Sequence, residues 1–194
     1  MKTQLAPGFL VASPKLEDPN FARSLVLMAE HGKDGAVGFI VNRPTQMPLA
    51  VLLRGVDREL AEVVAEGDFG EMKVLIGGPV QRHIAWVLYH RRPGEELLEG
   101  TIAVGERLVL GASMDVLRQL VRGERSGPFH VLLGYSGWGT FQLEGEIAHG
   151  SWLPLELEDD LTFGVPAIRR WEVAVERLGL TPGGFMMGGP GAMA

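Results

Sequence analysis

The segment SLVLMAEHGKDGAVGFIVNRP, from Ser24 to Pro44, decides the fold. It contains two apolar runs, Ser24–Glu30 and Ala36–Pro44, which are joined by a short loop that carries glycine. Aliphatic and β-branched runs bounded by turn residues are typical of buried strands. Because the loop is too short for a helical crossover, the two strands must pair antiparallel. The segment therefore predicts a β-hairpin and argues against a regular doubly wound fold.

The rest of the chain carries strand and helix patterns in an irregular order. Apolar runs predict strands at residues 9–12, 72–80, 85–90, 129–135 and 152–158, and two short strands around Gly105. Three- and four-residue spacing predicts helices at residues 48–66 (broken near Gly55), 114–121, 140–149 and 166–178. Ser113 is the expected N-cap of the second helix, and Gly179 is the expected stop of the last. That last helix should bury one face, made of Ile168, Trp171, Ala174, Val175 and Leu178. The pattern predicts an α+β or mixed-sheet α/β protein.

Composition places the chain among globular proteins. Its 194 residues are 46% hydrophobic and 22% charged, which predicts one domain over residues 1–181. Residues 182–194, rich in Gly, Pro and Met, are expected to form a mobile tail. The absence of cysteine excludes disulfides and cysteine-bound metals, and it fits a cytoplasmic location. No stretch is long and apolar enough for a membrane span, and the net charge of −6 disfavours direct nucleic-acid binding.

The stretch HVLLGYSGWGTFQLEGEI, residues 130–147, raises the question of a catalytic serine. A nucleophile elbow has the pattern G-x-S-x-G between a strand and a helix. Here Gly134 and Ser136 match, but Trp138 replaces the second glycine. The alternative is a tight structural corner that the glycines permit beneath a packed tryptophan. The sequence favours the corner, while a triad with His90, His149 or Asp115 stays open.

Other ligand motifs are incomplete. The spacing Gly134-x-x-Gly137-x-Gly139 reverses the order of a dinucleotide-binding loop. Glu146 and His149 form an E-x-x-H, but a bridged metal site needs a second copy, which the chain lacks. We therefore expect no metal and no cofactor.

The helix expected after the glycines carries an acidic stripe of Gln142, Glu144 and Glu146. Such a stripe is most simply a solvated helix face. It is also a candidate contact surface, or a source of a general acid–base carboxylate. Trp138 and Trp152 flank this helix and are the tryptophans most suited to a site there.

Several motifs together resemble the YqgE/AlgH family of bacterial proteins. They are FLVASP, DPNFARSLVLMAEHGKDGAVGFIVNRP, IGGPV, SMDVL, LLGYSGWGTFQLEGEIAHGSWL and the helix around Trp171, and they run from about residue 8 to about residue 180. The resemblance implies an α+β fold with a mixed, largely antiparallel, bifurcated sheet that forms a pseudo-barrel with flanking helices. It implies no established activity, although one branch of the family is named for an association with transcriptional regulation of alginate production.

The resemblance also separates architectural positions from functional candidates. The family commonly has alanine at the position of Ser136, which argues against a nucleophile there. It tends to have glycine just before the glutamine, where this chain has Thr140-Phe141. The polar and aromatic motif residues are the candidates for a binding surface: His31, Asn42, Asp115, Tyr135, Trp138, Gln142, Glu144 and Glu146.

We therefore interpret the sequence as that of a binding or regulatory module whose protein or small-molecule partner is unknown. Through this partner, the module could be linked to transcriptional regulation. The alternative is a hydrolase or acid–base enzyme that uses Glu144 or Glu146 with His90 or His149. No complete set of catalytic residues is present in the sequence, so the first reading is preferred.

Overall fold

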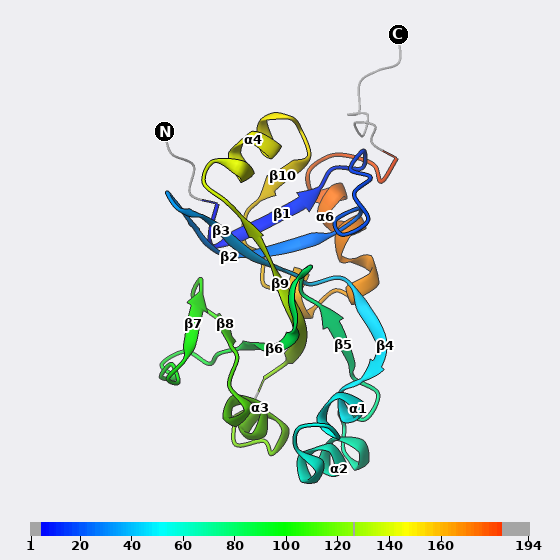
Figure 1. Cartoon of the computed structure of the whole chain (residues 1–194), viewed down its shortest axis with the longest axis vertical. Helices are drawn as coiled ribbons and strands as arrows, with labels where there is room; N and C mark the ends of the chain where they lie inside the picture. The colour runs from blue at the N-terminus through cyan, green and yellow to red at the C-terminus, as the bar shows by residue number, and fades with distance from the viewer. Residues whose placement is uncertain (1–4, 126, 184–194) are drawn as a thin grey trace.

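The computed structural model describes residues 5–125 and 127–183, and it is built around one sheet (Figure 1). The sheet has ten strands, and eight of them follow the order β10-β1-β2-β3-β9-β6-β8-β7. These eight are β1 (Gly8–Ala12), β2 (Leu25–Gly32), β3 (Gly35–Ile40), β6 (Val80–His90), β7 (Thr101–Val104), β8 (Leu108–Gly111), β9 (Phe129–Trp138) and β10 (Trp152–Leu155). The remaining two are β4 (Pro44–Pro48) and β5 (Lys73–Ile76), which pair with each other.

The sheet divides at β9. One edge of this strand pairs with β6 from Phe129 to Tyr135. The other edge is shared, because β5 pairs with it parallel at Leu132 and β3 pairs with it antiparallel at Ser136. The other described strand pairs are antiparallel. The expected α+β fold with a mixed, largely antiparallel, bifurcated sheet is therefore confirmed, and the sheet curls into a half-barrel.

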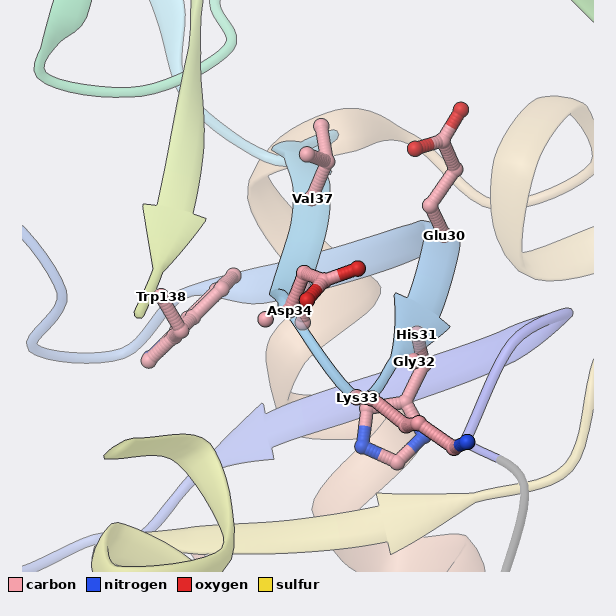
Figure 2. A pocket seen from close by; sticks show the side chains of 9 residues that line it. Glu30, His31, Gly32, Lys33, Asp34, Val37 and Trp138 are labelled. Atoms are coloured by element: carbon pink, nitrogen blue, oxygen red, sulfur yellow. The ribbon is translucent and has the colours of Figure 1, made fainter. Parts of the chain in front are cut away.

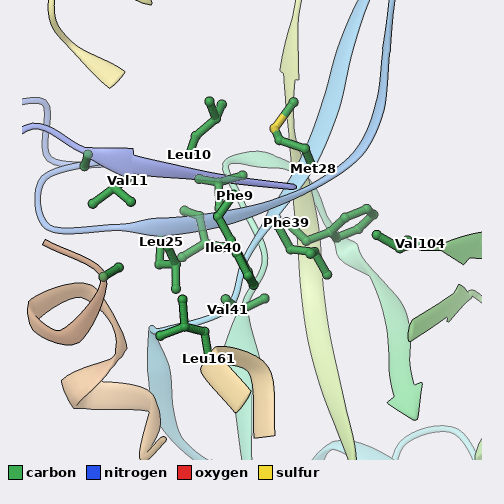
Figure 3. Close-up of a cluster of buried hydrophobic side chains, with 14 of the residues drawn as sticks. Phe9, Leu10, Val11, Leu25, Met28, Phe39, Ile40, Val41, Val104 and Leu161 are labelled. Atoms are coloured by element: carbon green, nitrogen blue, oxygen red, sulfur yellow. The ribbon is translucent and has the colours of Figure 1, made fainter. Parts of the chain in front are cut away.

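Two hydrophobic cores pack against opposite faces of the sheet. The first is centred on β1, β2 and β3 and includes Phe9, Met28 and Phe39 (Figure 3). The second packs helices α1 (Leu49–Leu53), α2 (Arg58–Glu66) and α3 (Met114–Val121) against the other half of the sheet. Along β9, Leu132 belongs to the first core and Val131 to the second. This strand therefore joins both halves of the molecule.

Helices occupy the two ends of the molecule. The helices α1, α2 and α3 gather at one end, and α4 (Gln142–Ala148) lies beside β10 at the other (Figure 1). The short helix α5 (Asp160–Phe163), the 3₁₀ turn η1 (Ala167–Arg169) and α6 (Arg170–Arg177) follow in the chain. No helix in the described ranges is long and apolar enough to cross a bilayer.

Several local predictions are confirmed. The hairpin of β2 and β3 forms, and the helical stretch after Pro48 breaks between Leu53 and Arg58. Ser113 caps α3, since its Oγ accepts from the Asp115 N–H at 3.2 Å. The last helix ends at Arg177 and is capped at Leu178; the next residue, Gly179, has φ +73, and the Leu180 N–H returns to the Val175 carbonyl. These two features are those of a Schellman motif.

Other predictions were wrong. The strand expected over 36–44 ends at Ile40, and Pro44 instead begins β4, where a missing N–H is tolerated because β4 pairs on one side only. The strand expected at 85–90 begins at Val80. In the last helix, Ile168 is 72% exposed because it lies in η1, before the α-helical spacing begins. Of the expected tail, residues 184–194 lie outside the described residues.

The expected corner at Gly134–Trp138 is also not a corner. Strand β9 continues through it to Trp138, and the chain turns only afterwards, at Gly139–Phe141. The glycines serve a different contact, in which the turn between β5 and β6 crosses the backbone of β9. A Cβ at Gly78 would lie 2.1 Å from the Tyr135 carbonyl oxygen, and one at Gly77 would lie 2.3 Å from that of Gly134. The two glycine-rich motifs are therefore matched to each other.

Candidate functional site

Helix α4 is attached to β9 by a turn with an unusual backbone. Phe141 stands at the N-cap of α4 with φ +58, in the left-handed region, and its side chain is 75% exposed. Gln142 closes the turn, because its Oε1 accepts from the Gly139 N–H at 3.0 Å and its N–H donates to the Gly139 carbonyl. The turn therefore presents Phe141 to solvent on an ordered backbone.

Glu146 is the centre of the contacts beneath this turn. Its Oε2 accepts from the indole N–H of Trp138 at 3.0 Å and from that of Trp152 at 2.7 Å. Its Oε1 accepts from the side-chain amide of Gln142 at 2.9 Å. The two indoles meet edge to face at 5.8 Å, and Phe21 packs against both. Glu146 thus faces the tryptophans rather than forming part of a solvated stripe.

Glu144 faces the β2–β3 hairpin instead. The Nδ1 atom of His31 accepts from the Leu5 N–H at 3.3 Å, which assigns the imidazole proton to Nε2. Nε2 then donates to Glu144 Oε1 at 3.1 Å. Both ring nitrogens of His31 are therefore engaged, and neither is free to act as a base.

A hollow of about 350 Å³ lies between the hairpin and Trp138 (Figure 2). The hairpin lines it with charged side chains, namely Glu30, Lys33 and Asp34, and Val37 and Trp138 add apolar surface. The hairpin approaches the end of β9 closely at Gly35. There φ is +134, and a Cβ would lie 2.1 Å from the Trp138 carbonyl oxygen. Glycine at this position therefore lets the hairpin and the turn before α4 meet.

The structure brings together five of the eight candidate residues. They are His31, Trp138, Gln142, Glu144 and Glu146. Tyr135 lies on β9 and packs against Phe39 at 6.4 Å. Asn42 is buried and structural, because it accepts from the Leu25 N–H at 2.7 Å and donates to the Arg23 carbonyl at 2.8 Å. Asp115 is 77% exposed, pairs with Arg118 and stands on α3 at the far end of the molecule (Figure 1).

The residues of the enzymatic alternative point to different partners. Ser136 is fully buried, and its hydroxyl lies 3.4 Å from the Gly77 carbonyl. His149 bonds the Gly145 carbonyl within its own helix at 2.6 Å, and His90 faces Asp159 at 3.4 Å. In the ranges 5–125 and 127–183, no cluster of three or more His, Asp or Glu side chains is placed to hold a metal.

Ser136→Ala tests the serine directly. We expect the free energy of unfolding to fall by less than about 1 kcal/mol, because the hydroxyl makes one long hydrogen bond. Its acceptor keeps a second donor, since the Gly77 carbonyl also accepts from the Ile40 N–H at 2.7 Å. Denaturant unfolding measures the change. A loss of several kcal/mol would show that the hydroxyl has a role that this geometry does not explain.

A second polar cluster lies among residues that no sequence motif singles out. Arg170 is 2% exposed and donates to the carbonyls of Val41 and Val165, and burial lowers the pKa of its guanidinium to about 10. His130 Nε2 lies 3.0 Å from both the Arg170 guanidinium and the Thr162 carbonyl. Burial, and then the charge of Arg170, lower the pKa of His130 to about 4. In the sequence, Arg170 is one of two adjacent arginines, and nothing there distinguishes the buried one.

The comparisons with known proteins agree over most of the chain. A family model described as AlgH-like matches residues 9–183. A UPF0301 protein of Anaeromyxobacter sp. (strain Fw109-5) is 53% identical, over 98% of this chain and 96% of its own. The solution structure of the AlgH protein from Pseudomonas aeruginosa matches with a TM-score of 0.72 and 32% identity, over 93% of this chain and 92% of that one.

A more distant match shows the fold alone. The crystal structure of protein DIP2367 from Corynebacterium diphtheriae has a TM-score of 0.69 at 22% identity, over 91% of this chain and 89% of that one. The bifurcated sheet is therefore shared beyond close sequence similarity. With a family model that matches residues 9–183 and a relative that is 53% identical, the chain belongs to the YqgE/AlgH family.

Proposed function

We propose that this chain is a binding module, and that it recognises a protein partner through the face formed by α4, the turn before it and the β2–β3 hairpin. The observation that carries the proposal is Phe141. A non-glycine residue in the left-handed region costs about 1–2 kcal/mol, and this one also leaves a large aromatic side chain in water. Aromatic side chains, phenylalanine among them, are enriched at the cores of protein interfaces relative to the rest of the surface.

The comparison with Arg23 supports this interpretation. Arg23 also has a positive φ, of 56°, but its carbonyl accepts from Asn42 and its guanidinium lies over the Trp171 ring at 5.3 Å. Its strain is thus offset by contacts within the chain. The Phe141 carbonyl also accepts a hydrogen bond, from the Gly145 N–H at 3.1 Å, but the Phe141 side chain has no aromatic partner among the described residues. The family tends to have glycine near this point. Backbone strain at a residue whose side chain gains no contact within the chain supports a functional position.

The side chains beneath Phe141 are held in place by hydrogen bonds, and a surface ordered in this way favours binding. The carboxylate of Glu146 fixes two indoles and Gln142, and Gln142 fixes the turn. A preorganised surface loses little conformational entropy when a partner docks. A regulatory role in transcription would act through this partner, since a net charge of −6 disfavours contact with phosphates.

The variant Phe141→Gly distinguishes an effect on stability from an effect on binding. We expect the free energy of unfolding to rise or stay level, by about 0–1 kcal/mol, because glycine adopts a positive φ without strain. We also expect the variant to lose the peptides that the wild type selects from a display library of random sequences. Ile168→Gly is the matched control, because Ile168 is equally exposed but stands on another surface.

Two outcomes would contradict the proposal. Peptides that bind the wild type and the Phe141→Gly variant equally would remove Phe141 from the binding surface. A thermal-shift screen that finds a metabolite, and a display library that yields no peptide, would favour a small-molecule partner. A saturating ligand at a hundredfold its Kd should stabilise the chain by about 2.7 kcal/mol, which such a screen detects.

A further inference from the structure

The segment between β6 and β7 is held to the molecule by few apolar contacts. Residues 91–100 form no helix or strand, and Leu98 is the one hydrophobic side chain among them that packs against the second core, while Leu97 is 42% exposed. Gly94 and Gly100 have φ values of +79 and +75, and a Cβ at either would meet nothing within 4 Å. Segments with few buried apolar contacts open at a low free energy. This segment can therefore move without breaking the sheet.

A shielded ion pair fastens the segment to the rest of the chain. Glu95 Oε1 lies 2.6 Å from Arg125 Nη1, and the two side chains are only 22% and 11% exposed. No other ion pair of the described residues is as shielded from solvent. The second carboxylate oxygen accepts from the Arg92 N–H at 3.0 Å, and Arg125 Nε donates to the Gln119 side chain of α3 at 3.0 Å. Loss of one member of such a pair leaves the other charge poorly hydrated, so the pair strongly favours the closed position.

Tyr89 lies beneath this ion pair, and its hydroxyl is buried without a hydrogen bond. The side chain is 1% exposed, the Arg125 guanidinium stands over its ring at 5.9 Å, and the hydroxyl has no partner among the described residues. Burial raises the pKa of the phenol, and the charged groups that face it are Arg125, Glu95 and Arg91. A buried hydroxyl without a partner destabilises the state that buries it. When the segment opens, water reaches the hydroxyl, so this group favours the open position.

We propose that residues 91–100 form a strap that opens and closes over Tyr89 as one unit, with the Glu95–Arg125 ion pair as its latch. The latch stabilises the closed strap and the unpartnered hydroxyl destabilises it, so two opposed contributions set the balance. A state that lies a few kcal/mol above the dominant one is populated at about 0.1–10%, and a change in either contribution shifts that population. The strap is tied to α3, at the opposite end of the molecule from α4, so it does not depend on the proposed binding face (Figure 1).

Hydrogen exchange followed by mass spectrometry tests the latch in the full chain. Glu95→Gln keeps the size of the side chain but removes its charge, and we expect the amides of residues 91–100 to exchange about tenfold faster. The amides of β8 should exchange as in the wild type, because a local opening leaves the sheet intact. Glu96→Gln is the matched control, since it removes an exposed carboxylate from the same strap. It should leave the exchange unchanged.

The hydroxyl provides a test of the opposite sign. Tyr89→Phe removes the group without a partner and keeps the ring, so we expect the amides of the strap to exchange about fivefold more slowly. A hydroxyl with a merely structural role would give the reverse result, because its removal would loosen the strap. Faster exchange in Tyr89→Phe would therefore overturn the proposal.

Nitration of tyrosine measures the opening independently. The chain has two tyrosines, so Tyr135 is an internal reference for Tyr89. We expect Glu95→Gln to raise the nitration of Tyr89 about tenfold and to leave that of Tyr135 unchanged. Equal increases at both tyrosines would show global unfolding rather than a moving strap. That result, or equal effects of Glu95→Gln and Glu96→Gln on exchange, would overturn the proposal.

Discussion

Glu146→Ala should lower the free energy of unfolding by about 3–5 kcal/mol, whereas Glu144→Ala should lower it by less than about 1 kcal/mol. The two glutamates stand two residues apart on α4 but have opposite surroundings. Removing Glu146 leaves the indole N–H groups of Trp138 and Trp152 without an acceptor, and both tryptophans are buried. Each lost bond to a charged acceptor costs about 1.5–3 kcal/mol. Glu144 is 47% exposed, so water replaces its contact with His31.

Denaturant unfolding, followed by tryptophan fluorescence, measures both variants, because two of the affected indoles report on the site itself. Glu146→Gln is the conservative control. Its amide oxygen can accept from both indoles, so it should recover most of the loss. Equal destabilisation by Glu146→Ala and Glu144→Ala would mean that the indoles find other acceptors, and the rigid base that we assign to the binding face would then be absent.

The second large effect is that the free energy of unfolding depends on pH through His130. Its pKa is about 4 in the folded protein and about 6.5 in the unfolded chain, so the unfolded chain takes up a proton that the folded one excludes. The contribution of His130 to the free energy of unfolding is therefore fully present above about pH 6.5, and it is lost as the pH drops towards 4. A difference of about 2.5 pKa units at about 1.36 kcal/mol each gives a loss of about 3 kcal/mol across this window.

His130→Leu should remove most of this dependence, and it is measured as the slope of unfolding free energy between pH 6.5 and 4. His83→Gln is the matched control, because His83 is exposed and its removal should leave the slope intact. The aspartates that pair with arginines affect the free energy of unfolding at a lower pH than His130 does. The pKa values of Asp57 and Asp160 are below the ordinary 3.8, so their contributions are lost only in stronger acid. A His130→Leu slope equal to that of the wild type would contradict the assignment.

Local patterns could be predicted from the sequence, because neighbours in the chain decide them. The Ser113 cap and the stop at Gly179 each depend on residues within about one turn of helix, and the hairpin depends on two strands that follow each other directly in the chain. The continuation of β9 through Gly134 could not be predicted in the same way. Glycine spacing signals a close approach but does not say which backbone approaches, and here it is the turn at Gly78, far away in the sequence.

The candidate site was predictable to a similar extent. The motif residues around α4 come together because they are adjacent in the chain, and the hairpin joins them through His31. Asn42 and Asp115 do not join this group. A polar side chain that hydrogen-bonds to the backbone and one that binds a partner cannot be told apart from the sequence. The burial of Arg170 depends on carbonyls of Val41 and Val165, whose orientation is fixed only in three dimensions.

The sharing of β9 between both halves of the sheet has a consequence for how the chain is made. Strands β2, β3, β5 and β6 all emerge from the ribosome before β9, yet β3, β5 and β6 each need β9 as a hydrogen-bonding neighbour. Their edges therefore stay open until Trp138 has been synthesised. Pairings between such distant segments slow folding and leave open strands liable to aggregate. The nascent chain thus carries open strand edges from the synthesis of β3, which ends at Ile40, until that of β9, which ends at Trp138.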